Sequence, residues 1–469
     1  MLSELNYQFK NNDMNKRYIC LTVIFIILIF VSCNKWLDPD INIDPDSPQN
    51  PTPDLLLSGV EARIGYIIGG FDAAGITGMW MKYIKGSDRQ AQKLGQYNIV
   101  EKDVDNLWGS LYSNILVDLQ LIIEKSKENR KKSPHYEGIA KILMAMTYGT
   151  ATQLWGDIPM TQALQGKNNI TPVYDSQESI YQNIQVLLNE AIELLKLPAD
   201  SNFYKVKGDM IYKNNISKWI KAAKSLKLRY MLHTSKVKGN TIYSQIINYY
   251  STDTLDFINS KNEDLQVNFG IGYTENNPLY QFDEQRGDCS YSPYFDSVLK
   301  SDIRKEVLVS KNDLFAGPYY GDKNSPVCFI TMAEVKLILA EAYYYKGIED
   351  SARLCLFNAF KASIEKTTAF LDTVITSMSQ LRQAELNKYN NKVSKLTGTN
   401  LIEEINKQQY IVLFLNPEAF VQWRRTGYPK FTDADKIPRR YPYSSEERLY
   451  NPNRPTNTNL FTRMWIDPQ

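Results

Sequence analysis

Apolar residues recur at helical spacing in several stretches of this 469-residue chain, and this pattern limits its fold more than any other feature. Three stripes are Leu107, Leu111, Ile115, Leu119 and Ile122; Ile139, Ile142, Leu143 and Met146; and Ile180, Ile184, Leu187, Leu188, Ala191, Leu194 and Leu195. A fourth runs from Trp219 through Ala223 and Leu226 to Tyr230. Because an apolar helix face must be buried against a neighbour, we expect a mostly α-helical fold made of paired helices.

Several helix ends can also be predicted. Ser133 and Pro134 are typical of an N-cap and a first helical residue, and Asp175 with Glu178 favours the start of another helix. Thr331 and Glu334 form a capping-box pattern before a helix that ends at Gly347. A last long helix is expected from Glu403 to Trp423 (403–423), and the tail from Tyr441 onwards is expected to lie irregularly on the body.

One helix pair has the small-and-large spacing of a tetratricopeptide unit. Its residues are Leu339, Ala340 and Tyr343, followed by Ala352, Leu356 and Ala359. We expect Ala340 and Ala359 to let two antiparallel helices approach, and Tyr343 and Leu356 to fill the space between them. The unit is degenerate, because it lacks the first tryptophan and the closing proline of the motif.

Residues 253–325 differ from the rest of the chain. Asn, Gly, Tyr and Asp dominate, and no helical period is evident. A connection of this length inside a compact protein is usually functional. We therefore expect a loop-rich insert at this place in an otherwise helical domain that spans residues 55–469.

The N-terminus has the pattern of a secretory signal. Positive residues at 15–17 precede an apolar run at 19–31, which is too short to cross a bilayer comfortably. Ser32 and Cys33 then resemble a bacterial lipobox, which implies cleavage before Cys33 and its acylation. The alternatives are a short membrane anchor or an ordinary signal with an incidental cysteine. We assign residues 1–32 to the signal peptide, with Met14 as the expected initiator.

Residues 33–54 are expected to form an extended, lipid-anchored tether, because five prolines between 39 and 53 forbid a regular helix. The acidic spacing from Asp38 invites comparison with a calcium-binding loop. Ile43 and Gln49 exclude it, since those positions require glycine and glutamate.

Charge and cysteine content exclude further classes. The formal net charge of +2 argues against a nucleic-acid partner, which needs a basic surface. Beyond Cys33, the cysteines are Cys289, Cys328 and Cys355, whose spacing fits neither a disulfide framework nor a zinc site.

Several segments, taken together in their order, resemble one family. They are Cys33–Asp38, Asn42–Pro48, Tyr148–Pro159, Lys218–Arg229, Met332–Ala342 and Phe420–Pro429. The chain is similar to the SusD/RagB-type nutrient-binding lipoproteins of glycan-foraging Gram-negative bacteria. One departure is Ser301–Arg304, where many relatives have Asp-Pro-Arg.

The resemblance implies four tetratricopeptide-like helix pairs as a scaffold, with irregular loops that bind the ligand. It also implies a surface-exposed protein, lipid-anchored in the outer membrane, that delivers oligosaccharides to a SusC-like TonB-dependent transporter. We expect no enzyme activity, no catalytic residue, no cofactor and no metal.

A carbohydrate site needs aromatic planes for sugar rings and polar groups for their hydroxyls. Two stretches offer both, in the regions from which the family's ligand face is drawn. The candidate residues are Trp80, Tyr83, Arg89, Gln92 and Tyr97 in the first stretch, and Tyr273, Asn276, Tyr280 and Tyr291 in the second. Trp80 and Tyr83 also have helical spacing, which is equally consistent with core positions.

Catalysis has little support in the sequence. His135 and His233 are the two histidines, and none of the common hydrolase, zinc-protease or phosphate-binding motifs is present. The alternatives to oligosaccharide binding are peptide cargo with the same partner, a lipid-anchored glycoside hydrolase, and a structural helical-repeat adaptor.

Overall fold

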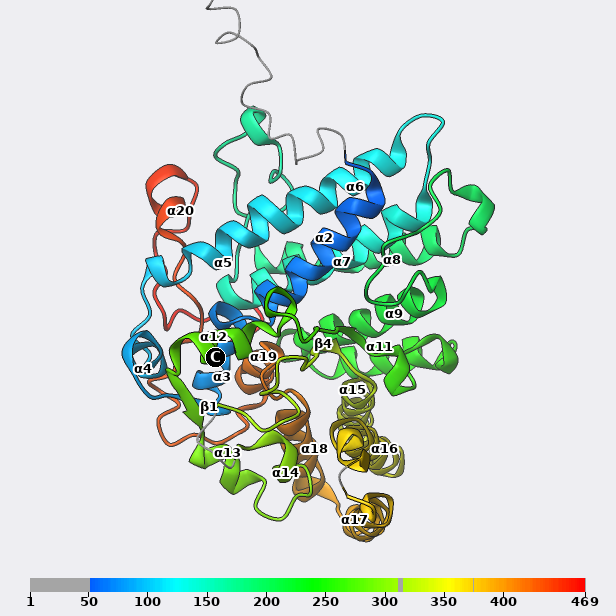
Figure 1. The fold of residues 1–469 in the computed structure, drawn as a ribbon, viewed down its shortest axis with the longest axis vertical. Coiled ribbons are helices and arrows are strands. Elements are labelled where there is room, and N and C mark those ends of the chain that lie inside the picture. Colours follow the sequence, from blue (N-terminus) through cyan, green and yellow to red (C-terminus); the bar gives the residue numbers. More distant parts are fainter. Residues whose placement is uncertain (1–50, 311–314, 374, 469) are drawn as a thin grey trace, which may run out of the picture. The chain divides into compact units, whose positions relative to one another are not determined.

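The computed structural model describes residues 51–310, 315–373 and 375–468, and this part of the chain is mostly helical, as predicted (Figure 1). The predicted signal peptide, Cys33 and nearly all of the tether lie outside the described residues. Among the described residues, no helix combines the length and the apolar character that crossing a membrane requires.

The helices up to residue 251 are α2 (Pro53–Ile68), α3 (Ile76–Trp80), α4 (Arg89–Gly95), α5 (Asp105–Gly109), α6 (Val117–Lys127), α7 (Pro134–Trp155), α8 (Gln177–Leu195), α9 (Ile216–His233), α10 (Ser235–Lys238) and α11 (Asn240–Ser251). Those that follow are α12 (Pro278–Arg286), α13 (Pro293–Val298), α14 (Lys305–Leu308), α15 (Met332–Tyr345), α16 (Glu349–Thr367), α17 (Met378–Val393), α18 (Gly398–Val412), α19 (Glu418–Thr426) and α20 (Ser445–Tyr450). Short helical turns used below are η2 (Phe71–Gly75), η3 (Glu101–Asp103) and η9 (Tyr273–Glu275).

The α7–α8 pair shows how the apolar stripes are used. Pro134 is the first residue of α7, as predicted, and the stripe residues Ile180, Ile184 and Leu188 of α8 are fully buried. Helix α7 also approaches α9 closely, because a side chain at Gly149 would overlap the ring of Tyr230. Burial of these apolar faces is what stabilises the helices as a series.

Helices α15 and α16 form the predicted tetratricopeptide-like pair. Ala340 and Ala359 are fully buried in the contact, Leu356 fills it, and Tyr343 packs at its edge. The chain turns between the two helices at Gly347, whose φ of +71° is favourable for glycine.

A buried ion pair joins α15 to its neighbour. Thr331 caps α15 by accepting a hydrogen bond from the Glu334 backbone N–H. The Glu334 carboxylate binds Arg229 of α9 at 2.6 Å, so it reaches the neighbouring helix. The capping-box residues are therefore correctly placed, but one of them links two helices.

Two predicted helix boundaries were wrong. The helix expected over 403–423 is divided into α18 and α19, because Pro417 cannot continue a helix, and the Asn416 side chain before it accepts from the Glu418 N–H. Helix α8 is capped by Ser176, whereas Asp175 accepts bonds from the backbone of Met160.

The insert at 253–325 has more regular structure than the sequence indicated. Strands β1 (Ile84–Gly86) and β3 (Cys289–Tyr291) pair antiparallel, as do β2 (Leu265–Val267) and β4 (Val327–Ile330). Helix α12 forms within the insert, because Asn277 caps it and Pro278 occupies its first position. The expectation that no helix occurs there is therefore corrected.

Two regions of the described chain can be distinguished in Figure 1. Helices α8, α9, α11, α15, α16 and α17 follow one another along one side, with α15 packed against α11, α16 and α18. Strand β1, the short helices α4, α13 and α20, and long irregular connections occupy the other side. We call the first region the helical scaffold and the second the irregular side.

Candidate functional site

The two stretches chosen from the sequence lie together on the irregular side. They are joined by the β1–β3 ladder, in which Ile84 is opposite Tyr291 and Gly86 is opposite Cys289. The Arg89 Nε donates to the Asp288 carboxylate at 2.6 Å, which fixes the start of α4 beside β3. Residues about 200 positions apart therefore contribute to one surface.

Two of the candidate residues belong to the core. Trp80 is fully buried and its indole N–H donates to the Leu94 carbonyl at 3.0 Å. Tyr83 is 1% exposed, stacks on Tyr410 with ring centres 4.5 Å apart, and donates its hydroxyl to the Tyr410 carbonyl. Neither ring faces solvent. Trp80 and Tyr83 are therefore core residues, as their helical spacing also allowed, and the predicted contact with a ligand is corrected.

The other residues of the first stretch differ in exposure. Arg89 and Gln92 are exposed, and the Gln92 amide donates to the Ser87 carbonyl at 3.4 Å, which is a long hydrogen bond. Tyr97 is half-buried and donates to Asp433 at 2.9 Å. Partial burial alone would raise the pKa of Asp433, but hydrogen bonds from Lys82 and Tyr97 lower it below its ordinary value. Arg89 and Gln92 thus have polar groups at the surface, whereas Tyr97 is held in a polar cluster.

In the second stretch, Tyr273 is displayed and Asn276 holds the loop that displays it. The Tyr273 side chain is 75% exposed, next to Ile271 at 72%. Asn276 is 7% exposed, and its amide nitrogen, assigned from the surrounding hydrogen-bond acceptors, donates to the carbonyl oxygens of Gly270 and Gly272 at 3.1 and 2.7 Å. We therefore assign Asn276 to the support of the Tyr273 loop, in place of the direct ligand contact that we predicted.

Tyr280 and Tyr291 are partly exposed. A hydrogen bond with Glu284 raises the pKa of Tyr280, which lies in the first turn of α12. Tyr291 lies at the end of β3, opposite Ile84.

Helix α12 brings further groups to this surface that the sequence analysis missed. Gln281 accepts from the Tyr66 hydroxyl at 3.0 Å and donates to the Tyr273 carbonyl at 3.1 Å. Phe282 stacks on Phe71, and the Arg286 guanidinium lies over the Phe282 ring at 5.4 Å. The Asn277–Pro278 pair was the available signal, because it predicts a helix start.

We call this surface the α12 face and define it as Tyr66, Tyr273, Gln281, Phe282 and Arg286. Tyr66 and Tyr273 are exposed aromatic rings, and Gln281 and Arg286 are polar groups between and beside them. Exposed rings bordered by amide and guanidinium groups can stack on sugar rings and bind their hydroxyls.

Carboxylates behind the α12 face are poorly solvated. Burial raises the pKa of Asp72 to about 6 and that of Asp283 also to about 6. One carboxylate oxygen of Asp283 and one of Asp288 have no hydrogen-bond partner among the described residues. Within the described ranges, no group of three or more His, Cys, Asp or Glu side chains is arranged to hold a metal ion.

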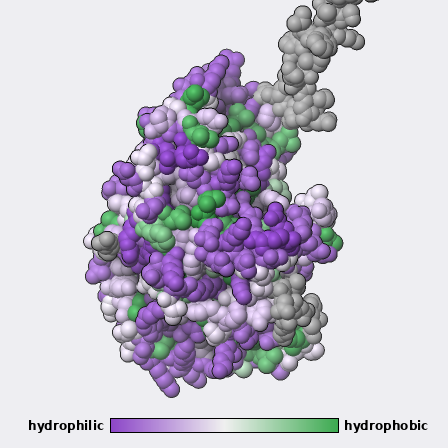
Figure 2. Space-filling view, turned by 90° about the vertical axis from the view of Figure 1, so that its left-hand side faces the viewer, coloured by the Kyte–Doolittle hydropathy of each residue, from purple (hydrophilic) through white to green (hydrophobic). Residues whose placement is uncertain are grey.

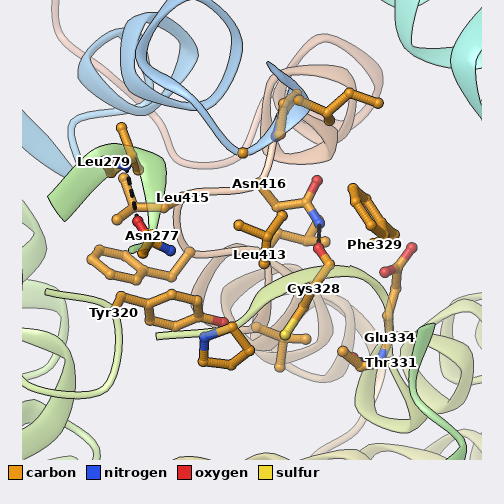
Figure 3. A pocket seen from close by; sticks show the side chains of 17 residues that line it. Asn277, Leu279, Tyr320, Cys328, Phe329, Thr331, Glu334, Leu413, Leu415 and Asn416 are labelled. Atoms are coloured by element: carbon orange, nitrogen blue, oxygen red, sulfur yellow. Dashed lines mark hydrogen bonds between the residues drawn. The ribbon is translucent and has the colours of Figure 1, made fainter. Parts of the chain in front are cut away.

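A small cavity lies behind the same region (Figure 3). Asn277, Tyr320, Cys328 and Asn416 are among its lining residues, and its volume is about 30 Å³. The Asn416 amide donates to the Cys328 carbonyl at 3.0 Å. A space of this size suits one water molecule and excludes a sugar ring, so the exposed α12 face is the better candidate.

Comparisons with known proteins agree with this architecture. A family model for SusD-like proteins, described as starch-binding and associating with the outer membrane, matches residues 48–321 and 300–444. No curated protein matches.

Solved structures have the same fold. A chitin-binding protein has a TM-score of 0.73 at 22% identity, over 89% of this chain and 100% of its own. A SusD/RagB family protein from Bacteroides thetaiotaomicron has a TM-score of 0.71 at 19% identity, over 86% and 95%. A chitin-binding SusD homolog from Flavobacterium johnsoniae has a TM-score of 0.71 at 18% identity, over 89% and 98%.

The family match extends over most of the chain, and the structural matches share its helical scaffold. The chain therefore belongs to the SusD-like family, whose members are described as starch-binding and associated with the outer membrane.

Proposed function

We propose that this protein is a cell-surface lipoprotein, anchored through Cys33, that binds oligosaccharides without cleaving them and passes them to a SusC-like TonB-dependent transporter. The α12 face carries the proposal, because its exposed Tyr273 ring stands on a loop braced by a buried amide. Ile271 and Tyr66 are exposed near this ring, and a contiguous exposed apolar patch is typical of a binding surface.

The character of the ligand follows from the groups on the face. Neutral amides and aromatic rings suit the hydroxyls and apolar faces of sugars, and a long irregular surface suits an oligomer. Two structural neighbours are named as chitin-binding, which supports a glycan as the class of ligand.

Calorimetry with a panel of oligosaccharides, including starch and chitin oligomers, tests the binding step. Binding to at least one glycan, with no release of new reducing ends, is the expected result. Binding confined to a peptide library would favour peptide cargo, and release of reducing ends would favour a hydrolase.

The anchor and the partner need separate experiments. Labelled palmitate should enter the wild-type chain and not Cys33→Ala, and protease added to whole cells should reach the protein. A pull-down from solubilised outer membranes should recover a large TonB-dependent barrel. Recovery of several unrelated proteins without a barrel would favour a structural adaptor.

A further inference from the structure

A second concave site lies on the irregular side, near α20 and the segment after α4. It is a groove of about 490 Å³ between Ile99–Lys102 and the C-terminal segment Arg440–Leu460. We call it the C-terminal groove. Figure 2 turns this side of the molecule towards the viewer and shows a mainly hydrophilic surface with small separated hydrophobic patches.

The charges that line the C-terminal groove are unbalanced. Four cationic side chains, Lys102, Arg440, Arg448 and Arg454, face one carboxylate, Glu101. Arg448 forms an ion pair with Glu101. The other three cations have no carboxylate within 4.0 Å among the described residues. The groove therefore keeps three cationic side chains that no carboxylate of the described chain pairs directly.

Arg440 is the most firmly held of these three cations. Its side chain is 5% exposed, its guanidinium donates to the Trp155 carbonyl, and it lies over the Tyr443 ring at 4.7 Å. A buried cation without a counter-ion is costly. Because Arg440 lines the groove and no carboxylate in the described ranges pairs with it, an anion that enters the groove would supply the missing counter-charge.

Two carboxylates beside the groove, Asp105 and Glu447, are bound to neutral donors and form no ion pair with its cations. Asp105 accepts from the backbone N–H of Ser445 at 2.7 Å. Glu447 accepts from the Tyr174 hydroxyl at 2.7 Å and from the Asn451 amide at 2.9 Å. Both carboxylates are thus engaged in holding the C-terminal segment in place.

We propose that the C-terminal groove binds the anionic group of an acidic sugar, a carboxylate or a sulfate ester, so that the oligosaccharides taken by this protein include acidic residues. This inference rests on the proposed function. The groove adjoins the α12 face, since the Gln90 amide of α4 accepts from Arg286 of that face at 3.5 Å and donates to Asp103, next to Lys102 of the groove, at 3.1 Å.

The test is calorimetry on the full chain with sodium glucuronate and with its neutral methyl ester. Glucuronate is expected to bind at least tenfold more tightly than the ester, and added sodium chloride should weaken it. Competition by sodium sulfate would indicate a site for either anion, and lack of competition would indicate a carboxylate-selective one.

Variants locate the site. Arg454→Gln and Lys102→Gln should each weaken glucuronate binding about fivefold or more, since neither side chain is buried. Lys196→Gln, an exposed lysine at the end of α8, is the control and should bind as wild type does. Equal binding of glucuronate and its ester, or binding that both groove variants leave unchanged, would overturn the proposal.

The two proposals can fail separately. If neutral oligosaccharides bind through Tyr273 and glucuronate does not bind, only the proposal for the C-terminal groove is wrong. If glucuronate binds in the groove and no oligosaccharide binds on the α12 face, the proposed function is wrong and the anion site remains.

Discussion

The α15–α16 pair and the α12 face use apolar side chains in opposite ways. In α15–α16, Leu356 is buried between small residues and the interlocking holds the helices together. On the α12 face, Tyr273 remains exposed because a hydrogen-bonded loop supports it from below. The first arrangement stabilises the fold, and the second presents apolar surface for binding.

The largest effect is expected from a substitution in the contact between α15 and α16. Leu356→Ala should lower the free energy of unfolding by about 3 kcal/mol, because it leaves a cavity in the helix contact. Leu354, two residues earlier in α16, is 61% exposed and is the matched control. Urea denaturation should show Leu354→Ala within about 0.5 kcal/mol of wild type. Equal losses for both variants would show that the contact does not depend on Leu356.

The pH dependence of stability should have opposite sign in the two regions. Burial raises the pKa of Asp72 to about 6, so its contribution to stability is present at low pH and lost as pH rises through 6. Asp72→Asn should therefore stabilise the protein at pH 8 by about 2 kcal/mol, with the gain shrinking towards pH 4.

Glu418, which begins α19 and contacts α9 of the helical scaffold, should behave in the reverse way. Although burial opposes ionisation, His233 and Arg229 lower the pKa of Glu418. Its contribution is present above its unfolded pKa and is lost as pH falls through the lowered value. Glu418→Gln should thus destabilise the protein more at pH 7 than at pH 3. Urea titrations with the same sign of pH dependence for both variants would contradict this contrast.

A smaller effect is expected from the loop below Tyr273. Asn276→Ala removes the amide next to the Gly270 and Gly272 carbonyls, which should cost about 1 kcal/mol of stability. It should also weaken glycan binding, because Tyr273 loses its support. Weaker binding with an unchanged crystal position of Tyr273 would instead indicate direct contact by Asn276.

The scaffold was largely predictable from the sequence, because each apolar stripe reports one buried helix face. The stripes over α7, α8 and α9 and the Ala340–Ala359 contact required only local spacing. The boundary at Pro417 was missed because apolar residues continue across it, although proline already argued for a break.

The candidate site was less predictable, since exposure there depends on distant partners. Trp80 and Tyr83 are buried by residues such as Tyr410 and Phe420, which lie over 300 positions away in the chain. The β1–β3 pairing likewise joins segments with no periodic signal. Composition indicated that these stretches mattered, but only the fold separates Tyr273, which is displayed, from Asn276, which supports it.

Calorimetric titration of the Tyr66→Ala/Tyr273→Ala double variant, with a glycan that the wild type binds, tests the binding surface most directly, because both rings are exposed on the α12 face. We expect at least a tenfold weaker affinity, equal to about 1.4 kcal/mol, with a nearly unchanged melting temperature. Phe203→Ala, which removes a 58% exposed ring outside the α12 face, should leave affinity unaltered. Unchanged affinity in the double variant, or an equal loss in Phe203→Ala, would contradict a binding surface on the α12 face.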